Sequence, residues 1–250
     1  MLSHEHRCVI LILISAAAVV ALFFVDPIAQ DPNYHFFADS RHIAGISNFW
    51  NVASNLPFVI VGTLGLLRYP RLLHEESANA YLILCVGIVL VGFGSAYYHY
   101  APTNQTLLWD RLPMTVAFMA LLSLLLGERV LRTPRPQLVW ILVLVGAAAT
   151  LYWAWTESLG KGDLRSYAIV QFLPVLLIPL TLAMFRQRYL SSRLLLWAFG
   201  FYLLAKAFEY FDGQIFIATA VMSGHAIKHV AAAVAVLCLI YAIPTRLINR

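Results

Sequence analysis

Eight long apolar stretches decide what this chain can fold into. Each has about 20 residues, the length that an α-helix needs to cross the roughly 30 Å hydrocarbon core of a bilayer. Hydrophobic residues fill 61% of the 250 positions and charged residues 12%, and a water-soluble globule cannot bury so much apolar surface. Because only helices and closed barrels cross a bilayer, and these stretches are too long for strands, we predict an all-α integral membrane protein. The predicted spans are residues 8–25, 48–67, 79–99, 107–127, 137–156, 166–185, 193–211 and 221–243.

The first span has two interpretations. It starts at His4 to Arg7 and continues apolar to Val25, as a signal peptide does, but no small-x-small cleavage motif precedes Asp26. We therefore favour an uncleaved transmembrane helix over residues 1–26, placed before a unit of seven helices over residues 27–250.

The composition argues against several other classes of protein. The net charge is +5, but no basic run with interleaved aromatic residues indicates nucleic-acid binding. The cysteines Cys8, Cys85 and Cys238 lie in apolar segments without paired spacing, which argues against a disulfide framework and against a cysteine zinc site. Short loops and the lack of an added soluble domain favour a bacterial inner membrane as the host.

The loop cations predict the orientation, because Lys and Arg collect on the cytoplasmic side of a membrane protein. Eleven arginines fall on one side of the eight spans and three cations on the other, so both termini are expected in the cytoplasm. The first group is Arg7, Arg68, Arg71, Arg129, Arg132, Arg135, Arg186, Arg188, Arg193, Arg246 and Arg250, and the second is Arg41, Lys161 and Arg165.

Ionisable residues inside the spans are expensive and by default mark a functional site. Ser95 and His99 end the third span four residues apart, so they share a helix face. His225 and His229 have the same spacing at the start of the eighth span, and Asp110 lies near the start of the fourth. The predicted topology places all five near the non-cytoplasmic ends of their helices.

Such a layer has the composition of a catalytic zinc site, which takes three protein ligands and leaves one position open. His99, His225 and His229 are the candidate ligands, and two histidines at i and i+4 can bind one metal from one helix face. Asp110 is the candidate proton acceptor, and Ser95 the candidate donor to the developing oxyanion.

Two other polar groups keep alternatives open. Lys206, Glu209 and Asp212 recur on one face of the seventh span, where they form either a buried ion-pair network or the wall of a polar cavity. A polar stripe in the second span either lines a cavity or bonds neighbouring helices, and we favour helix bonding. The stripe consists of Ser47, Asn48, Asn51, Ser54 and Asn55.

Three blocks of sequence resemble motifs of the alkaline ceramidases, within a superfamily that includes adiponectin-receptor-like proteins. The resemblance extends over about residues 45–235. The blocks are Asn48 to Asn55, then Gly92 to His99 with Asp110 following inside Leu107 to Met114, and Gly224 to His229.

The resemblance implies a seven-helix core that binds one zinc through His99, His225 and His229, with Asp110 and Ser95 as partners of the zinc site. It also implies hydrolysis of the amide bond of a ceramide-like membrane lipid to a long-chain base and a fatty acid. The first span is then an addition to the family's seven helices.

The sequence departs from the family pattern at several positions. Arg111 stands where the animal enzymes have an acid, and Lys228 where they have an aromatic residue. Asn48 replaces the last acid of the family's calcium-binding run, which makes a calcium site doubtful. The positive charges near the predicted metal would suit an anionic headgroup or a carboxylate product.

Other functions remain open on sequence grounds. A zinc-containing seven-helix receptor or sensor would close the site with a fourth ligand and show no turnover. A transporter using Lys206, Glu209 and Asp212 would be expected to carry an internal repeat, and none is found. A hydrolase of a different membrane lipid is the third alternative, and the sequence gives no oligomeric state.

Overall fold

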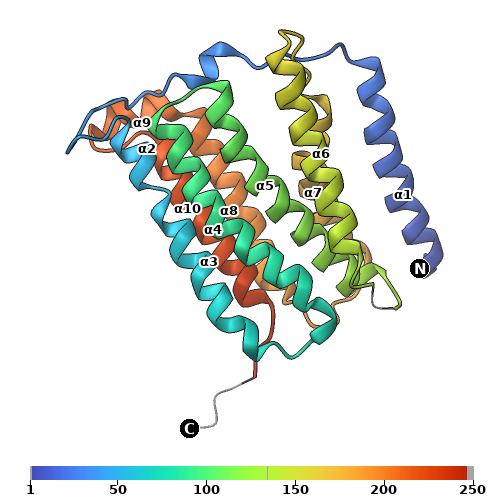
Figure 1. The fold of residues 1–250 in the computed structure, drawn as a ribbon. Coiled ribbons are helices and arrows are strands. Elements are labelled where there is room, and N and C mark those ends of the chain that lie inside the picture. Colours follow the sequence, from blue (N-terminus) through green and yellow to red (C-terminus); the bar gives the residue numbers. More distant parts are fainter. Residues whose placement is uncertain (1, 134, 247–250) are drawn as a thin grey trace.

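The computed structural model describes residues 2–133 and 135–246 as a bundle of long α-helices (Figure 1). Isolated bridges pair Ile43 with Ile46 and Leu72 with Thr245, and this part of the chain contains no named strand. The α-helices are α1 His4–Ala21, α2 Phe49–Ala53, α3 Leu56–Arg68, α4 Ala78–Tyr100, α5 Asn104–Leu125, α6 Leu138–Ser158, α7 Arg165–Met184, α8 Ser192–Tyr210, α9 Asp212–Thr219 and α10 Gly224–Ala242. Short 3-10 segments cover Leu22–Phe24, Pro32–His35, Tyr69–Arg71 and Glu75–Ser77, and a π-helical turn covers Leu126–Val130.

The helices confirm an all-α protein with the composition of a multi-pass membrane protein. Within the described residues, seven helical segments are long and apolar enough to cross a bilayer, and they coincide with seven of the predicted spans. The eighth predicted span, 193–211, corresponds to α8. This helix bends by 78° into the short α9, and the bent pair brings the number of candidate spans to eight.

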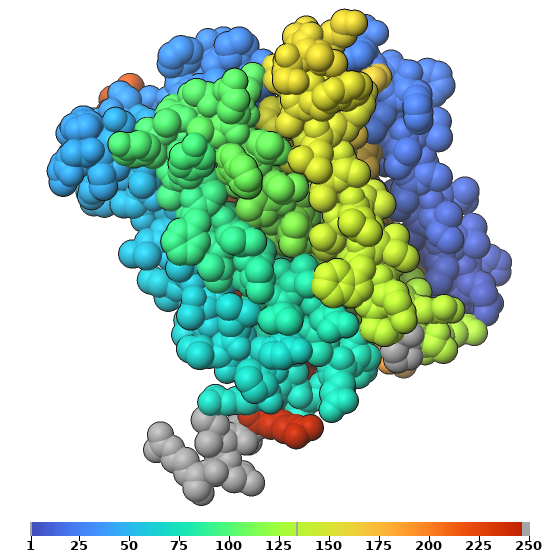
Figure 2. Space-filling model, viewed as in Figure 1, coloured from blue at the N-terminus to red at the C-terminus, as the bar shows by residue number. Residues whose placement is uncertain are grey.

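The first helix lies at the edge of the bundle. It runs beside α7 in the ribbon view, and the space-filling view shows it next to α6 (Figures 1 and 2). Most of its surface faces outward, but Leu11 is buried against apolar residues of α5 and α7. Two arginines connect the ends of this segment to the bundle. Arg7 donates a hydrogen bond to the carbonyl of Met184, and Arg165 donates one to the carbonyl of Val25. The division of the chain between residues 26 and 27 stays a prediction.

The start of α1 and the end of α10 lie at the same end of the bundle (Figure 1). Contacts gather arginines of the larger predicted group at this end, including Arg132 with Glu5 and Arg188 with Leu131. Arg41 and Arg165 hold loops at the opposite end. The two ends therefore differ in charge as the sequence predicts, and we call them the arginine-rich end and the histidine end.

Candidate metal centre

Three histidines converge at the histidine end of the bundle. His99 comes from the last turn of α4, and His225 and His229 come from the first two turns of α10. All three are buried, with exposed fractions of 1%, 8% and 4%. Their ring centroids are 4.9, 4.9 and 5.0 Å apart, and one ligand nitrogen from each lies within 4.8 Å of the others. The structure thus brings together the three histidines singled out in the sequence.

The nitrogens of this cluster fit a metal ion. His99 Nδ1 is buried and has no hydrogen-bond partner among the described residues. His229 Nδ1 lies 2.8 Å from the Ser54 hydroxyl. The other ring nitrogen of His229 is therefore free to bind a metal ion. Imidazole nitrogens are donors that zinc accepts, and a hydrogen bond at the second nitrogen is the usual way to orient a metal-binding histidine.

Polar side chains of neighbouring elements support the backbone around the histidines. Asn48 donates from Nδ2 to the carbonyl oxygen of His99 at 2.8 Å. Asp212 accepts from the backbone N–H of His225 at 2.6 Å, and so satisfies a free donor in the first turn of α10. Its second oxygen accepts from the N–H of Ala38 at 3.0 Å. Asp212 therefore ties the start of α10 to the loop before α2.

Two residues of the polar stripe bond neighbouring helices, which is the interpretation that we favoured from the sequence. Ser54 reaches His229, and Asn48 reaches His99. Asn51 donates to the carbonyl of Asp39 at 3.0 Å, and Asn55 donates to the carbonyl of Asn51 at 2.7 Å. The sequence did not indicate that Ser54 touches a candidate metal ligand.

Asp110 and Ser95 lie on adjacent helices next to the cluster, and both are buried. Gly94 allows this approach, because a Cβ at its position would lie 2.0 Å from the carbonyl oxygen of Trp109. Pro113 has no N–H to offer that carbonyl, which therefore lacks its helical partner and is free to face α4. The Asp110 carboxyl and the Ser95 hydroxyl both border one cavity and lie close to each other.

A network of charged side chains connects α8 to the histidines. Glu209 pairs with Lys206 at 2.6 Å and with Lys228 at 3.0 Å. Lys228 Nζ also lies 3.0 Å from His225 Nε2. Lys206, Glu209 and Lys228 line the cavity as well, so both interpretations of the seventh-span residues apply to Lys206 and Glu209. Asp212 does not belong to this network, because the bend after α8 turns it toward the loop and α10.

An irregular loop covers the outer side of the cluster. The Phe37 ring lies 4.7 Å from that of His99 and 4.9 Å from that of His225. Asp39 and Arg41 form a two-bonded ion pair at 2.7 and 2.8 Å, and Arg41 also donates to the carbonyls of Ala220 and Val221 after α9. Burial works against the Asp39 charge, but the bonds from Arg41 outweigh it and hold the pKa of Asp39 below its usual value.

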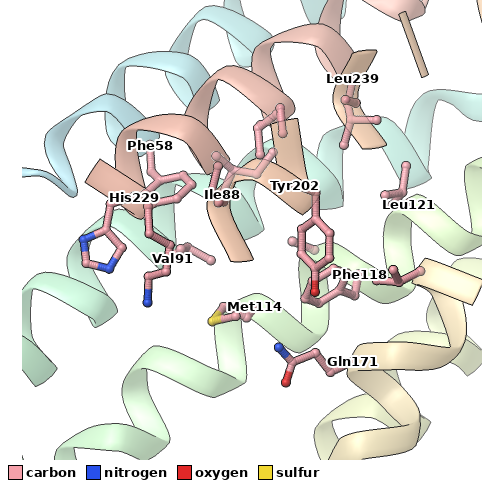
Figure 3. A pocket seen from close by; sticks show the side chains of 18 of the residues that line it. Phe58, Ile88, Val91, Met114, Phe118, Leu121, Gln171, Tyr202, His229 and Leu239 are labelled. Atoms are coloured by element: carbon pink, nitrogen blue, oxygen red, sulfur yellow. The ribbon is translucent and has the colours of Figure 1, made fainter. Parts of the chain in front are cut away.

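A cavity of about 220 Å³ lies inside the bundle, and of the three histidines His229 lines it (Figure 3). His229 lies at one end, and Leu121 and Leu239 lie far from it. Ten residues of α10 separate His229 from Leu239, which is about 15 Å along a helix. The wall is mostly apolar; Ser95, Asp110 and Lys228 are polar lining residues, and Gln171 and Tyr202 lie farther from His229. Phe58, Ile88, Met114 and Tyr202 are among its lining residues.

The family model described as Ceramidase matches residues 32–246, which is most of the chain and includes every element named above as part of the centre. The chain belongs to the ceramidase family. No curated protein matches it. Family membership indicates an amidohydrolase with a ceramide-like lipid as substrate, and it confirms the resemblance found in the sequence motifs. The match begins at residue 32, after the end of α1.

Proposed function

We propose that this ceramidase-family protein is a zinc-dependent hydrolase that cleaves the amide bond of ceramide-like N-acyl lipids inside the membrane. The observation that carries the proposal is the cluster of three buried histidines, one of which, His229, lines an apolar cavity together with Asp110 and Ser95. The apolar wall suits an acyl chain, and the polar groups lie where the amide of such a lipid would end up.

We assign His99, His225 and His229 as the zinc ligands. Among the described histidines, cysteines and acids, the group close enough to share an ion has these three members, and Asp110 is not one of them. This favours a site with an open position over the closed four-ligand site of a structural zinc. Bound there, zinc would supply Lewis acidity and lower the pKa of a water molecule toward neutrality.

We assign Asp110 as the general base and acid. Its carboxylate accepts a proton from the water whose oxygen forms a bond to the amide carbonyl carbon. The same proton then goes to the amide nitrogen as the C–N bond breaks, which releases a long-chain base and a fatty acid. Ser95 donates its hydroxyl hydrogen toward the carbonyl oxygen, where negative charge develops in the transition state.

The remaining neighbours hold these groups in place. The Ser54 bond at His229 Nδ1 and the Asp212 bond at the His225 backbone fix both histidines of α10. The Phe37 ring packs at an angle against the rings of His99 and His225 and limits access of bulk water from outside. The lipid reaches the cavity from the membrane. In this account the protein sits in a bacterial inner membrane, with its termini in the cytoplasm and the site on the opposite side.

The test is Asp110→Asn, with Asp31→Asn as the matched control at an exposed helix start. Fatty acid release from ceramide is measured by mass spectrometry on the purified chain, together with its zinc content. Loss of a general base costs about 10²- to 10⁴-fold in rate, so we expect such a loss in Asp110→Asn with zinc retained, and normal rates in Asp31→Asn. Full activity in Asp110→Asn would refute the assignment. Zinc binding without turnover of any N-acyl lipid by the wild type would favour the receptor-like alternative.

A further inference from the structure

Arg111 is a buried cation in the wall of the lipid cavity. It follows Asp110 in α5 and is 6% exposed. Its guanidinium carbon lies 4.2 Å from the ring centre of Trp153 and 4.7 Å from that of Tyr167, so aromatic faces surround it. One of its terminal nitrogens, Nη2, donates to the Gln30 side chain at 2.6 Å. The guanidinium is therefore fixed in place by neutral groups.

The other terminal nitrogen of Arg111 has nothing to bond. Nη1 is buried and has no hydrogen-bond partner in the part of the chain that the structure describes. Within the same residues Arg111 forms no ion pair, whereas Arg41, Arg129 and Arg165 each have a carboxylate partner. A buried charge normally has a counter-charge, because removal from water is costly. Attraction to aromatic faces offsets part of this cost but leaves the Nη1 hydrogens without an acceptor.

The charges of the cavity wall do not balance either. Its cations are Arg111, Lys206 and Lys228, and its carboxylates are Asp110 and Glu209. Three positive groups thus face two negative ones. Glu209 is already bonded to both lysines, and its bonds do not extend to Arg111. The wall thus carries one more cation than carboxylates, and of its three cations Arg111 is the one that forms no ion pair with a described residue.

We propose that Arg111 is a receptor for an anionic oxygen group carried by the lipid. The inference rests on the proposed function in that the lipid is the substrate or product of the hydrolase. A guanidinium presents paired N–H groups to a carboxylate or phosphate, and Nη1 is free to donate while Nη2 stays on Gln30. The anion has two possible sources, an acidic headgroup on the substrate or the carboxylate of the released fatty acid.

The experiment compares binding of matched lipids to the zinc-loaded full chain in detergent. One pair is palmitic acid and hexadecanol, and the other is ceramide with a phosphate on its headgroup and plain ceramide. Dissociation constants are measured for the wild type, Arg111→Gln and Arg132→Gln, a control at an exposed ion pair. We expect the wild type and Arg132→Gln to bind the anionic member of at least one pair at least tenfold more tightly. In Arg111→Gln this preference falls below threefold, while binding of the neutral lipids is unchanged.

The pattern across the pairs identifies the source of the anion. A preference within the fatty acid pair alone assigns Arg111 to the product, and a preference within the ceramide pair alone assigns it to the headgroup. Equal binding within both pairs by the wild type would overturn the proposal, and so would a preference that survives in Arg111→Gln. If Arg111→Gln does not fold, Arg111→Lys replaces it. Lysine keeps the positive charge but lacks the paired N–H groups of the guanidinium, so the preference for the anionic lipid should fall several-fold. An undiminished preference would refute the proposed role of Arg111.

Because these measurements use binding, they do not depend on turnover. A wild type that prefers the anionic lipid but hydrolyses nothing would refute the proposed hydrolase and leave the anion site standing. A wild type that hydrolyses ceramide but binds both members of each pair equally would refute the anion site and leave the proposed hydrolase standing.

Discussion

The two ends of the bundle both bury charged groups, but these groups differ in the partners that they bond. At the arginine-rich end, Glu128 and Arg129 lie 2.8 Å apart with almost no exposure. Glu128 also accepts from three consecutive backbone N–H groups, those of residues 188–190, and Arg129 donates to two carbonyls and to Ser192. This pair holds the loop between α7 and α8. Glu128 Oε2 and Arg129 Nε lie 2.8 Å apart as an ion pair, and neither atom has a hydrogen-bond partner among the described residues.

At the histidine end the buried polar groups are left incomplete. His99 Nδ1 and Arg111 Nη1 have no hydrogen-bond partner among the described residues; Arg111 lines the cavity, and His99 belongs to the histidine cluster beside it. Leaving such groups unpaired costs stability, which a protein tolerates where a ligand completes them. We therefore expect the paired charges of Glu128 and Arg129 to stabilise the fold, and the free nitrogens of His99 and Arg111 to be available to ligands.

The largest effect on stability is expected at the arginine-rich end. Arg129→Leu leaves Glu128 buried without its counter-charge, and removing one partner of a buried pair costs about 3–5 kcal/mol. We expect a loss of that order in the free energy of unfolding, measured by SDS titration. The protein that stays folded should bind zinc normally. A loss below about 1 kcal/mol would contradict the structural role of this pair.

A smaller and different effect is expected at Ser54, which bonds His229 Nδ1. Removing a partner of a metal-binding histidine typically weakens metal affinity by about 10- to 100-fold. Ser54→Ala should therefore lower zinc affinity by that factor in chelator competition, with little change in unfolding. Ser47→Ala is the control, because Ser47 belongs to the same stripe but contacts His42 rather than a candidate ligand. Equal affinities in both variants would rule out the support role of Ser54.

Lys228 should act in the opposite direction. Its ammonium group lies 3.0 Å from His225 Nε2. There it competes with a zinc ion for the nitrogen, and its positive charge repels the ion. We expect Lys228→Met to bind zinc about tenfold more tightly, which is about 1.4 kcal/mol. Weaker zinc binding in this variant would show that Lys228 positions His225 instead. Lys161→Met, in a loop away from the histidines, provides the baseline.

The smallest effect concerns the loop over the site and its dependence on pH. The pKa of Asp39 is lower in the folded chain than its ordinary value near 4. Its carboxylate therefore stabilises the fold fully above about pH 4, and the contribution is lost as the pH falls through the lowered pKa. Asp39→Asn should imitate the acid state at neutral pH, with faster hydrogen exchange in residues 36–47.

A second Asp-x-Arg pair provides the control for this loop. Asp163 and Arg165 make the same set of bonds at 2.8 to 3.1 Å, but they hold the end of α1 instead of the loop over the histidines. Asp163→Asn should therefore leave exchange in residues 36–47 unchanged. Faster exchange there in both variants would mean that the loop is not anchored locally.

Much of this arrangement could be predicted because it depends on local patterns. Apolar length located the spans, and i, i+4 spacing with alternating span direction placed His99 at the same depth as His225 and His229. Contacts between distant segments could not be predicted in this way. The loop bearing Phe37 has no periodicity, and Ser54 meets His229 across 175 positions of sequence. The bend after α8 separated Asp212 from its apparent partners on one helix face.

The central claim is that His99, His225 and His229 bind a catalytic zinc. The most direct measurement is the zinc content of the purified wild type and His225→Ala by mass spectrometry, paired with fatty acid release from ceramide. We predict one zinc per wild-type chain and measurable release, with both lost in His225→Ala. A wild type that hydrolyses ceramide without zinc, or a His225→Ala variant that loses zinc and keeps full activity, would contradict the account.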